Sequence, residues 1–303
     1  MDRAVAWIER NTTGPVLALV ECANSYGATL VNRLQTAGAD VREAKPPGRR
    51  PHPQTGKTDP ADAENAARQA LSADPGRLPR PRPNTGPTAA LQVLLTARER
   101  LTTRRTADIN ALTALLRAHN LGVDARHALT GAQIHAAAWR TRREDPATAI
   151  IRAHAHARDL AAALVAADCD LAANKTQITA AVAQLGPGLL DINGVGPVVG
   201  AVILRAWGQT GRLRDEAAFA ALAGVAPIPA SSGNTVRHRL NRHGDRKLNQ
   251  AIHTIAQVRK ATDPTTQAYI EKRVAQGKTR REATRCLKRY IATEIYRHLK
   301  NTP

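Results

Sequence analysis

The sequence predicts an α/β domain at the N-terminus, followed by a long helical arm and a mainly helical C-terminal domain. Short apolar runs alternate with helical periodicity over residues 1–74, and apolar residues recur at helical spacing over 89–185. From residue 186 to 303 Gly/Pro-rich turns separate short helices. Residues 75–88 are rich in proline and read as a linker between the first domain and the arm.

The N-terminal domain is expected to alternate helix and strand. Residues 16–21 form an apolar run after Gly14 and Pro15, which is typical of a buried parallel strand. Pro60 suits the first turn of a helix, because proline there loses no hydrogen bond. In chain order we expect a helix over 2–10, a strand over 16–21, a helix over 26–37, a strand over 39–44, a loop over 46–58 and a helix over 59–71.

The arm is predicted as two helical stretches. Leucines and isoleucine recur at helical spacing over 89–120, and an Ala-rich helical stretch follows over 130–185, interrupted near 143–146. A single long arm or a coiled-coil pair fits this pattern, and packing of the helices against the other domains fits it equally well. Further along, residues 265–300 predict a basic helical region.

Charge is the strongest compositional signal. The net charge is +19, and residues 235–303 hold 17 Lys and Arg against five Asp and Glu, a local net charge of +12. A GC-rich genome would favour Arg and Ala codons, but it would not concentrate the charge in one segment. The clustering therefore predicts a polyanion binder. Aromatic residues make up only 3% of the chain, so contact with the nucleic-acid backbone is expected rather than stacking on bases.

Other classes of protein are disfavoured. No apolar run approaches the ~18 residues of a membrane span, and no secretion signal is recognisable at the N-terminus. The three cysteines are far apart in the sequence, which fits reduced thiols rather than disulfides or a zinc site. We therefore expect a cytoplasmic protein that is not associated with a membrane.

Three carboxylates form the first candidate site. Glu21 ends the predicted strand, where α/β sheets place ligands, and Asp59 and Asp62 lie on one side of a helix's first turn. Together they could hold Mg²⁺, which prefers oxygen ligands. Alternatively, Asp59 caps the helix and Asp62 complements its dipole.

Two segments of the C-terminal domain are candidate DNA contacts. The run Leu189–Ala201 contains Gly194, Val195 and Gly196 between apolar helices, a helix-hairpin-helix pattern whose amides could bind a phosphate; a plain helical hairpin is the alternative. Ser231 and Ser232 lie in a Pro/Gly loop that basic residues follow. Such residues would stabilise charge on a phosphoryl group attacked by a serine, or would only bind phosphates. The basic candidates for DNA contact are Arg237, Arg239, Arg242, Arg246 and Lys247.

Taken together, these motifs resemble the insertion-sequence 110-type transposases. Residues 20–27 and 56–63 resemble their N-terminal domain, and residues 192–196, 219–227 and 231–233 resemble their second domain, in the same order and at similar spacing. The resemblance implies a RuvC-like, ribonuclease-H-type N-terminal domain with an Asp-Glu-Asp-Asp metal site. It also implies a helical arm and a C-terminal domain with a catalytic serine.

The resemblance also assigns roles to residues. Glu21, Asp59 and Asp62 would be three of the four Mg²⁺ ligands, and Ser232 would be the nucleophile that forms a transient link to DNA, with Ser231 as its competitor. The implied partners are double-stranded DNA, a structured guide RNA and further copies of the chain, in a dimer or tetramer.

Two departures from the family pattern carry expectations. The family's first Asp lies on the opening strand of its sheet, and Asp2 precedes a helix instead, so we expect an N-terminally truncated chain that is impaired in catalysis and unstable in its N-terminal domain. Cys22, Ala23 and Asn24 replace the family's usual Gly-Thr-Gly. The rival hypotheses are a non-catalytic DNA- or RNA-binding remnant and a metal-dependent repair nuclease that needs no serine.

Overall fold

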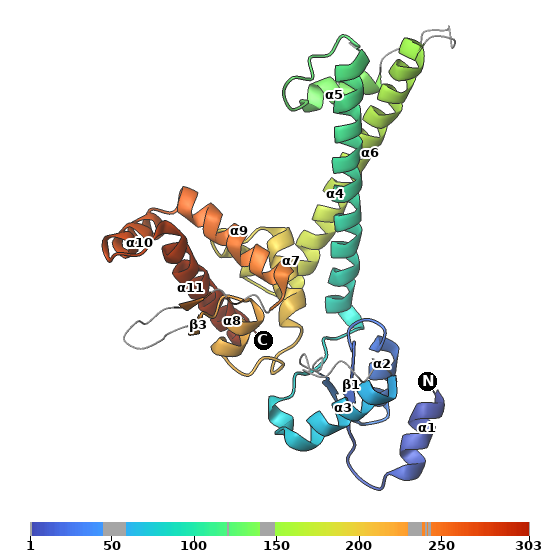
Figure 1. The fold of residues 1–303 in the computed structure, drawn as a ribbon, viewed down its shortest axis with the longest axis vertical. Helices are drawn as coiled ribbons and strands as arrows, with labels where there is room; N and C mark the ends of the chain where they lie inside the picture. The colour runs from blue at the N-terminus through green and yellow to red at the C-terminus, as the bar shows by residue number, and fades with distance from the viewer. Residues whose placement is uncertain are drawn as a thin grey trace. The chain divides into compact units, whose positions relative to one another are not determined.

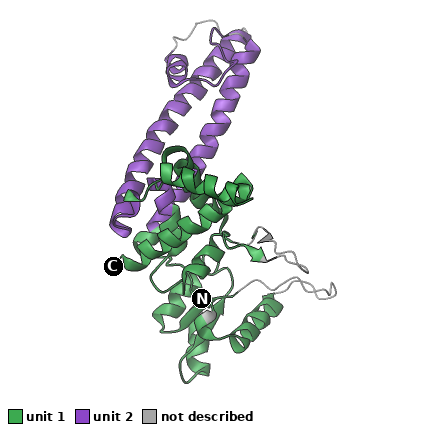
Figure 2. Cartoon of the chain, turned by 90° about the vertical axis from the view of Figure 1, so that its left-hand side faces the viewer, with its two compact units in different colours: residues 1–89, 191–195, 202–303 green, residues 90–190, 196–201 purple. Residues whose placement is uncertain are grey.

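The computed structural model describes residues 2–44, 59–119, 121–139, 149–229, 238–239, 241 and 244–302. The chain divides into two compact units (Figure 2). Unit 1 comprises residues 1–89, 191–195 and 202–303, and unit 2 comprises residues 90–190 and 196–201. Helices account for most of the described residues, and the described strands form two short pairs (Figure 1).

The N-terminal part of unit 1 is built on a parallel pair of strands. Strand β1 (Leu17–Val20) pairs with β2 (Asp40–Glu43) in the register Leu17 to Asp40 and Val20 to Glu43. Helix α2 (Ala28–Thr36) connects them, as a parallel pair requires. Val20 and Val41 from the strands pack with Val31 and Leu34 from α2, and α1 (Asp2–Asn11) adds Val5 and Ile8 to the edge of this core. The predicted strands and helices are thus confirmed to within two residues at each end.

The segment after the second strand packs on both strands of the pair. Helix α3 (Asp59–Ser72) contacts β1, and the short 3₁₀ helix η1 (Pro75–Arg77) follows it. Arg42 of β2 is buried, pairs with Asp40 at 2.8 Å and donates a hydrogen bond to the carbonyl of Leu78 at 3.1 Å. The amide of Glu43 also donates to the carbonyl of Pro79. The start of the proline-rich segment is therefore held against the edge of β2.

Unit 2 is a helical hairpin. Helices α4 (Gly86–His119) and α6 (Ala149–Leu185) run side by side in opposite directions (Figure 1), and the short helix α5 (Gly131–Ala138) packs on α6. Asn174 of α6 donates to the carbonyl of Leu94 at 3.0 Å, and Arg105 of α4 pairs with Asp168 of α6. From Leu94 to Arg105 the residue number rises along α4, while the contacted residue of α6 falls from Asn174 to Asp168, so the two helices are antiparallel. The apolar seam contains Leu112, Leu116, Ile134, Ala161 and Leu164.

The C-terminal part of unit 1 is a helical bundle. Its last helix, α11 (Arg280–Asn301), contacts three others, and the chain's only phenylalanine, Phe219, is fully buried. The ring of Trp207 lies edge-on to those of Phe219 and Tyr296, with centroids 6.2 and 5.5 Å apart. The other helices are α7 (Pro197–Trp207), α8 (Glu216–Leu222), α9 (Arg246–Thr262) and α10 (Pro264–Ala275).

An ion pair inside this bundle joins two helices to a turn. Arg259 of α9 makes two hydrogen bonds to the carboxylate of Glu294 on α11, at 2.8 and 3.1 Å, and a third to the carbonyl of Asn193 at 2.8 Å. Only 9% of the Arg259 side chain is exposed. Arg259 therefore stabilises the packing of α9, α11 and the turn at Asn193, and it is not available for contacts at the protein surface.

The basic helical region predicted over 265–300 is confirmed, and it consists of two helices. A turn at Gly277, where φ is +86°, separates α10 from α11. Glycine adopts this conformation without strain, and Thr279 then caps α11 in a reciprocal capping box with Glu282.

Candidate functional site

The first candidate residue, Glu21, begins a tight turn after β1. Its side chain is exposed, as expected of a residue that follows a buried strand. The amides of Ser25 and Gly27 both donate to the carbonyl of Cys22, at 2.9 and 3.1 Å, and Cys22 has a positive φ of 50°. Among the residues described, Cys22 is the single non-glycine with a positive φ, so this turn stores local strain.

Gly27 makes this turn possible. A Cβ atom on Gly27 would lie 2.8 Å from the carbonyl oxygen of Glu21 and 2.8 Å from Cγ1 of Val20. Any other residue would therefore push the turn away from the strand. The last residue of the quoted Val20–Gly27 motif thus has a structural role: it sets the backbone position of Glu21.

Asp59 and Asp62 lie where the sequence predicted, in the first turn of α3. Asp59 is exposed and Asp62 is half-buried, and α3 packs against β1, the strand that leads to Glu21. Over the described ranges, however, no three His, Cys, Asp or Glu side chains are grouped so that they could hold a metal ion. The structure thus brings the helix and the strand together without assembling the three carboxylates.

The glycine turn lies between η2 (Leu189–Asp191) and α7, and its three candidate residues differ in their surroundings. Gly194 has a φ of +85°, and a Cβ there would lie 3.0 Å from Cγ2 of Ile255 and 3.2 Å from its carbonyl oxygen. Val195 is buried, whereas the space beside Gly196 is open. Gly194 therefore allows close packing against α9, and Gly196 alone leaves room for a ligand to approach the backbone.

The candidate nucleophile lies outside the described residues. Ser231, Ser232, Arg237 and Arg242 all belong to this group, and for Arg239 only the backbone is described. On either side, β3 (Ile228–Pro229) pairs antiparallel with β4 (His238–Arg239), with Pro229 opposite His238. The two ends of the serine segment are therefore held next to each other.

Arg246 and Lys247 form the first turn of α9, and both side chains are exposed. Asp245 caps this helix: its Oδ1 accepts hydrogen bonds from the amides of Lys247 and Leu248, each at 3.0 Å. The helix start thus combines two exposed basic side chains with a carboxylate that caps the helix.

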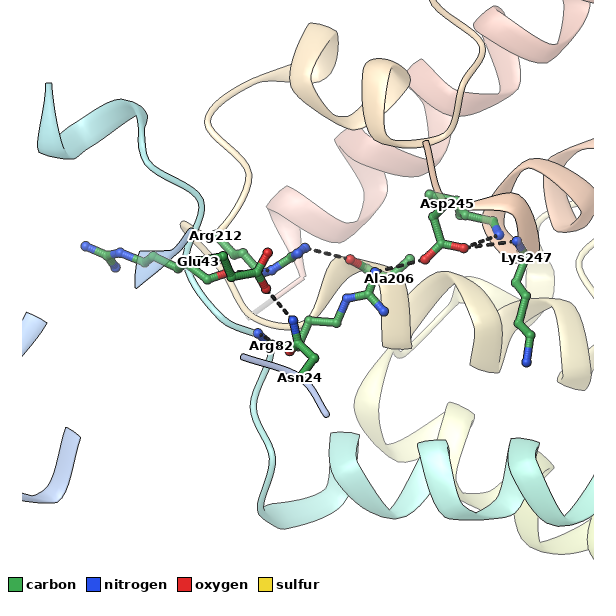
Figure 3. A network of polar contacts seen from close by, with 9 residues as sticks. Asn24, Glu43, Arg82, Ala206, Arg212, Asp245 and Lys247 are labelled. Atoms are coloured by element: carbon green, nitrogen blue, oxygen red, sulfur yellow. Dashed lines mark hydrogen bonds and ion pairs between the residues drawn. The ribbon is translucent and has the colours of Figure 1, made fainter. Parts of the chain in front are cut away.

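Sequence analysis missed a polar network that joins Asp245 to the turn after Glu21 (Figure 3). The second oxygen of Asp245, Oδ2, pairs with Nη2 of Arg82 at 2.8 Å. The amide of Arg82 donates to Oδ1 of Asn24 at 2.9 Å, and Nδ2 of Asn24 donates to the carboxylate of Glu43. The only sequence signal was the basic residues among the prolines of 75–88, which the linker interpretation passed over.

Two further arginines complete this network. Nε of Arg212 donates to the carbonyl of Arg80 at 3.1 Å, and its Nη1 donates to the carbonyl of Ala206 at 2.9 Å. Burial, and after it the nearby charge of Arg82, lowers the pKa of Arg212 to about 10. The pKa of Arg205 is lowered for the same two reasons, burial first and then Arg82. Positive charge is thus concentrated at this point of unit 1.

Comparison with known proteins finds two family matches in the chain. Residues 187–271 match the family described as Transposase IS116/IS110/IS902, and residues 1–121 match the DEDD-type transposase family of IS110. The chain therefore contains two regions that match IS110-family transposase domains. The Glu21 turn, α3 and the network partners Asn24, Glu43 and Arg82 all lie within residues 1–121. The glycine turn and α9 lie within residues 187–271.

Two curated proteins of insertion elements are also similar to parts of the chain. The 43.6 kDa protein of insertion element IS110 from Streptomyces coelicolor is 30% identical over 132 residues, which is 43% of this chain and 33% of the relative. The 42 kDa protein of insertion element IS900 from Mycobacterium paratuberculosis is 31% identical over 120 residues, 37% of this chain and 29% of the relative. The chain thus matches about a third of each relative's length. Among the described helices, none has both the length and the apolarity needed to cross a membrane.

Proposed function

We propose that this chain is a DNA transposase of an insertion sequence that cleaves and exchanges DNA strands with a serine nucleophile and Mg²⁺-bound carboxylates. The match of both halves of the chain to IS110-family transposase domains carries this proposal. The partners would be double-stranded DNA, a structured guide RNA and further copies of the chain. The N-terminal domain would have the RuvC-like fold and the glycine turn would act as a helix-hairpin-helix.

The metal ligands would be Glu21, Asp59 and Asp62. Their donor set fits Mg²⁺, because all three supply carboxylate oxygens and Glu21 and Asp59 are exposed to solvent. The contact of α3 with β1 supports this proposal, because the helix that carries the two aspartates packs on the strand that precedes Glu21. When bound, Mg²⁺ would stabilise negative charge at the scissile phosphate.

Ser232 would act as the nucleophile. Its Oγ would attack the DNA phosphorus, forming a phosphoserine ester, while the bond to the leaving ribose oxygen breaks and that oxygen takes up the proton. The pairing of Pro229 with His238 supports this role, because it holds the ends of the serine segment next to each other. Gly196, with open space at its backbone, and the exposed side chains of Arg246 and Lys247 would bind DNA phosphates.

A covalent-adduct assay tests the serine directly. The chain is incubated with end-labelled duplex DNA and Mg²⁺, and denaturing gels then separate protein–DNA adducts from free strands. We expect adducts in low yield with the natural chain and with Ser231→Ala, since Asp2 lies in α1 and does not supply a fourth carboxylate on the strand, and none with Ser232→Ala. Adducts that survive Ser232→Ala would overturn the assignment. Cleavage without any adduct would instead indicate a metal-dependent nuclease, and salt-sensitive binding without cleavage would indicate a binding protein.

The carboxylates are tested by Mg²⁺ binding itself. The protein is titrated with Mg²⁺ in a calorimeter, and Glu21→Gln and Asp59→Asn are compared with Glu64→Gln. Glu64 is an exposed carboxylate of the same helix that pairs with Arg68. We expect the first two variants to weaken binding at least about tenfold, as loss of a charged ligand should, and Glu64→Gln to leave it unchanged. Equal binding by all three variants would refute the metal site.

A further inference from the structure

Three arginines of unit 1 meet where the proline-rich segment crosses the helical bundle. We call Arg82, Arg205 and Arg212 the arginine cluster. Two carboxylates, those of Glu43 and Asp245, act on it electrostatically, so the cationic groups outnumber the anionic ones. Figure 3 shows Arg82 and Arg212 between Glu43 on one side and Asp245 on the other.

Both carboxylates already have other donors. Asp245 accepts from Arg82 and also caps α9 through the amides of Lys247 and Leu248. Glu43 accepts from Asn24. Arg212, by contrast, donates to two main-chain carbonyls, which hold the guanidinium in place but do not neutralise its charge. Arg212 is therefore positioned by uncharged groups, and the three guanidinium groups of the cluster still outnumber the two carboxylates.

The surroundings make this excess charge costly. Arg205 is buried, with 7% of its surface exposed, and burial together with like charge lowers the pKa of both Arg205 and Arg212. Nε of Arg82 is also buried and lacks a hydrogen-bond partner among the described residues. An anion placed here would gain donors and offset the repulsion between the guanidinium groups.

Solvent still reaches one side of the cluster. The Arg82 side chain is 21% exposed, Arg212 is half-buried, and Arg80 and Lys247 are exposed. A ligand can thus approach without unfolding the bundle. The fork of a guanidinium matches the oxygens of a phosphate, which makes arginine the common residue for this task.

We propose that the arginine cluster binds one backbone phosphate of the nucleic acid, and so fixes the strand beside the turn that carries Glu21. The hydrogen bond between the Arg82 amide and Asn24 makes this link, because Asn24 lies in that turn. Nucleic acid as the source of the phosphate rests on the proposed function. The phosphate site itself does not.

The first arm of the test uses inorganic phosphate. Thermal unfolding of the natural chain is followed by fluorescence in phosphate and in chloride at equal ionic strength, alongside Arg212→Gln and Arg214→Gln. Arg214 is the matched control, since its side chain is 66% exposed two positions away. At phosphate about tenfold above its Kd we expect the melting temperature of the natural chain and of Arg214→Gln to rise by about 3 °C, and that of Arg212→Gln to stay constant. An equal rise in all three proteins would overturn the proposal.

A second measurement covers the case in which Arg212→Gln does not fold. Hydrogen exchange of the natural chain is measured by mass spectrometry with phosphate and with chloride. We expect phosphate to slow exchange in peptides covering 79–84 and 205–213, with no change in peptides of α10. Exchange that is equal in the two salts, or slowed only elsewhere, would refute the site without any variant.

The second arm identifies the source of the phosphate. The affinity for a duplex oligonucleotide is measured against salt concentration, and we expect the slope of log K against log salt to fall by about 0.9 in Arg212→Gln and to stay unchanged in Arg214→Gln. Loss of the phosphate effect with an unchanged slope would mean that the site takes a free phosphate, which overturns the nucleic-acid part. A chain that binds phosphate at the cluster but forms no adduct would refute the proposed function and leave this site standing.

Discussion

Gly194 and Gly277 provide a matched pair that tests how the glycine turn is held. Their backbones have the same conformation, with φ of +85° and +86°. A Cβ on Gly194 would meet Ile255 at 3.0 to 3.3 Å, whereas a Cβ on Gly277 would have nothing within 4 Å. Substitution of each by alanine therefore imposes the same backbone strain, and a steric clash in one case only.

The expected magnitudes follow from these two terms. An alanine in the left-handed region costs about 1–2 kcal/mol, and an extra methyl group forced into a packed site adds about 1–3 kcal/mol. We expect Gly277→Ala to lower the free energy of unfolding by about 1 kcal/mol and Gly194→Ala by about 3 kcal/mol. The backbone oxygen and Cα of Ile255 are among the atoms met, so a side-chain rotation cannot relieve the clash.

Urea unfolding followed by tryptophan fluorescence measures both values. Trp207 lies in the bundle core with 7% exposure, while Trp7 and Trp139 are 60% and 82% exposed, so the change in emission reports mainly on the bundle. Equal losses for the two variants would refute the claim that Gly194 is required by packing against α9. The loss of stability at position 194 would then come from the positive φ alone.

Three further predictions concern the same bundle. Gly196→Ala should leave the free energy of unfolding unchanged, because the space beside Gly196 is open. If the amides of the turn bind a phosphate, the same variant should weaken duplex DNA binding about threefold to tenfold. Unchanged affinity in a fluorescence-anisotropy titration would argue against that contact. Arg259→Met should lower the free energy of unfolding, measured in urea, by about 2–3 kcal/mol, because it leaves Glu294 and the carbonyl of Asn193 without their donor. A loss below about 0.5 kcal/mol would show that this ion pair is no stronger than one at the protein surface. The pKa of His253 is lowered by burial and then by Lys288 and Lys260, so the unfolded chain takes up the proton first as the pH falls. The melting temperature should therefore drop as the pH is lowered from 7 through 6. His253→Gln should flatten this dependence, and an unaltered profile would exclude His253 as its source.

Local patterns were enough for most of the elements. The apolar run 16–21, the helical spacing around Leu30 and Leu34 and the proline at position 60 predicted β1, α2 and α3, because the spacing of apolar side chains and the stereochemistry of proline act over a few residues. The same reasoning placed Glu21 at a strand end and Asp59 in a first helical turn. The pattern over 265–300 predicted helix but did not reveal the break at Gly277, because the sequence does not show whether the φ of a glycine within a helical pattern is positive.

Which distant residues meet was decided by the tertiary structure. Arg82 and Asp245 are 163 residues apart, and Arg259 reaches Asn193 across 66 residues, separations over which no periodicity carries information. Position 194 could be read as a phosphate-binding glycine from the sequence, yet its contact with Ile255 exists only once α9 packs against the turn. The sequence by itself determined the N-terminal helices, the positions of the two strands and the basic character of the C-terminal segment, whereas the parallel pairing of these strands appeared only in the structure. Tertiary folding alone decided that three arginines gather beside the Glu21 turn, because a charge cluster of this kind forms only when burial forces distant side chains into one place.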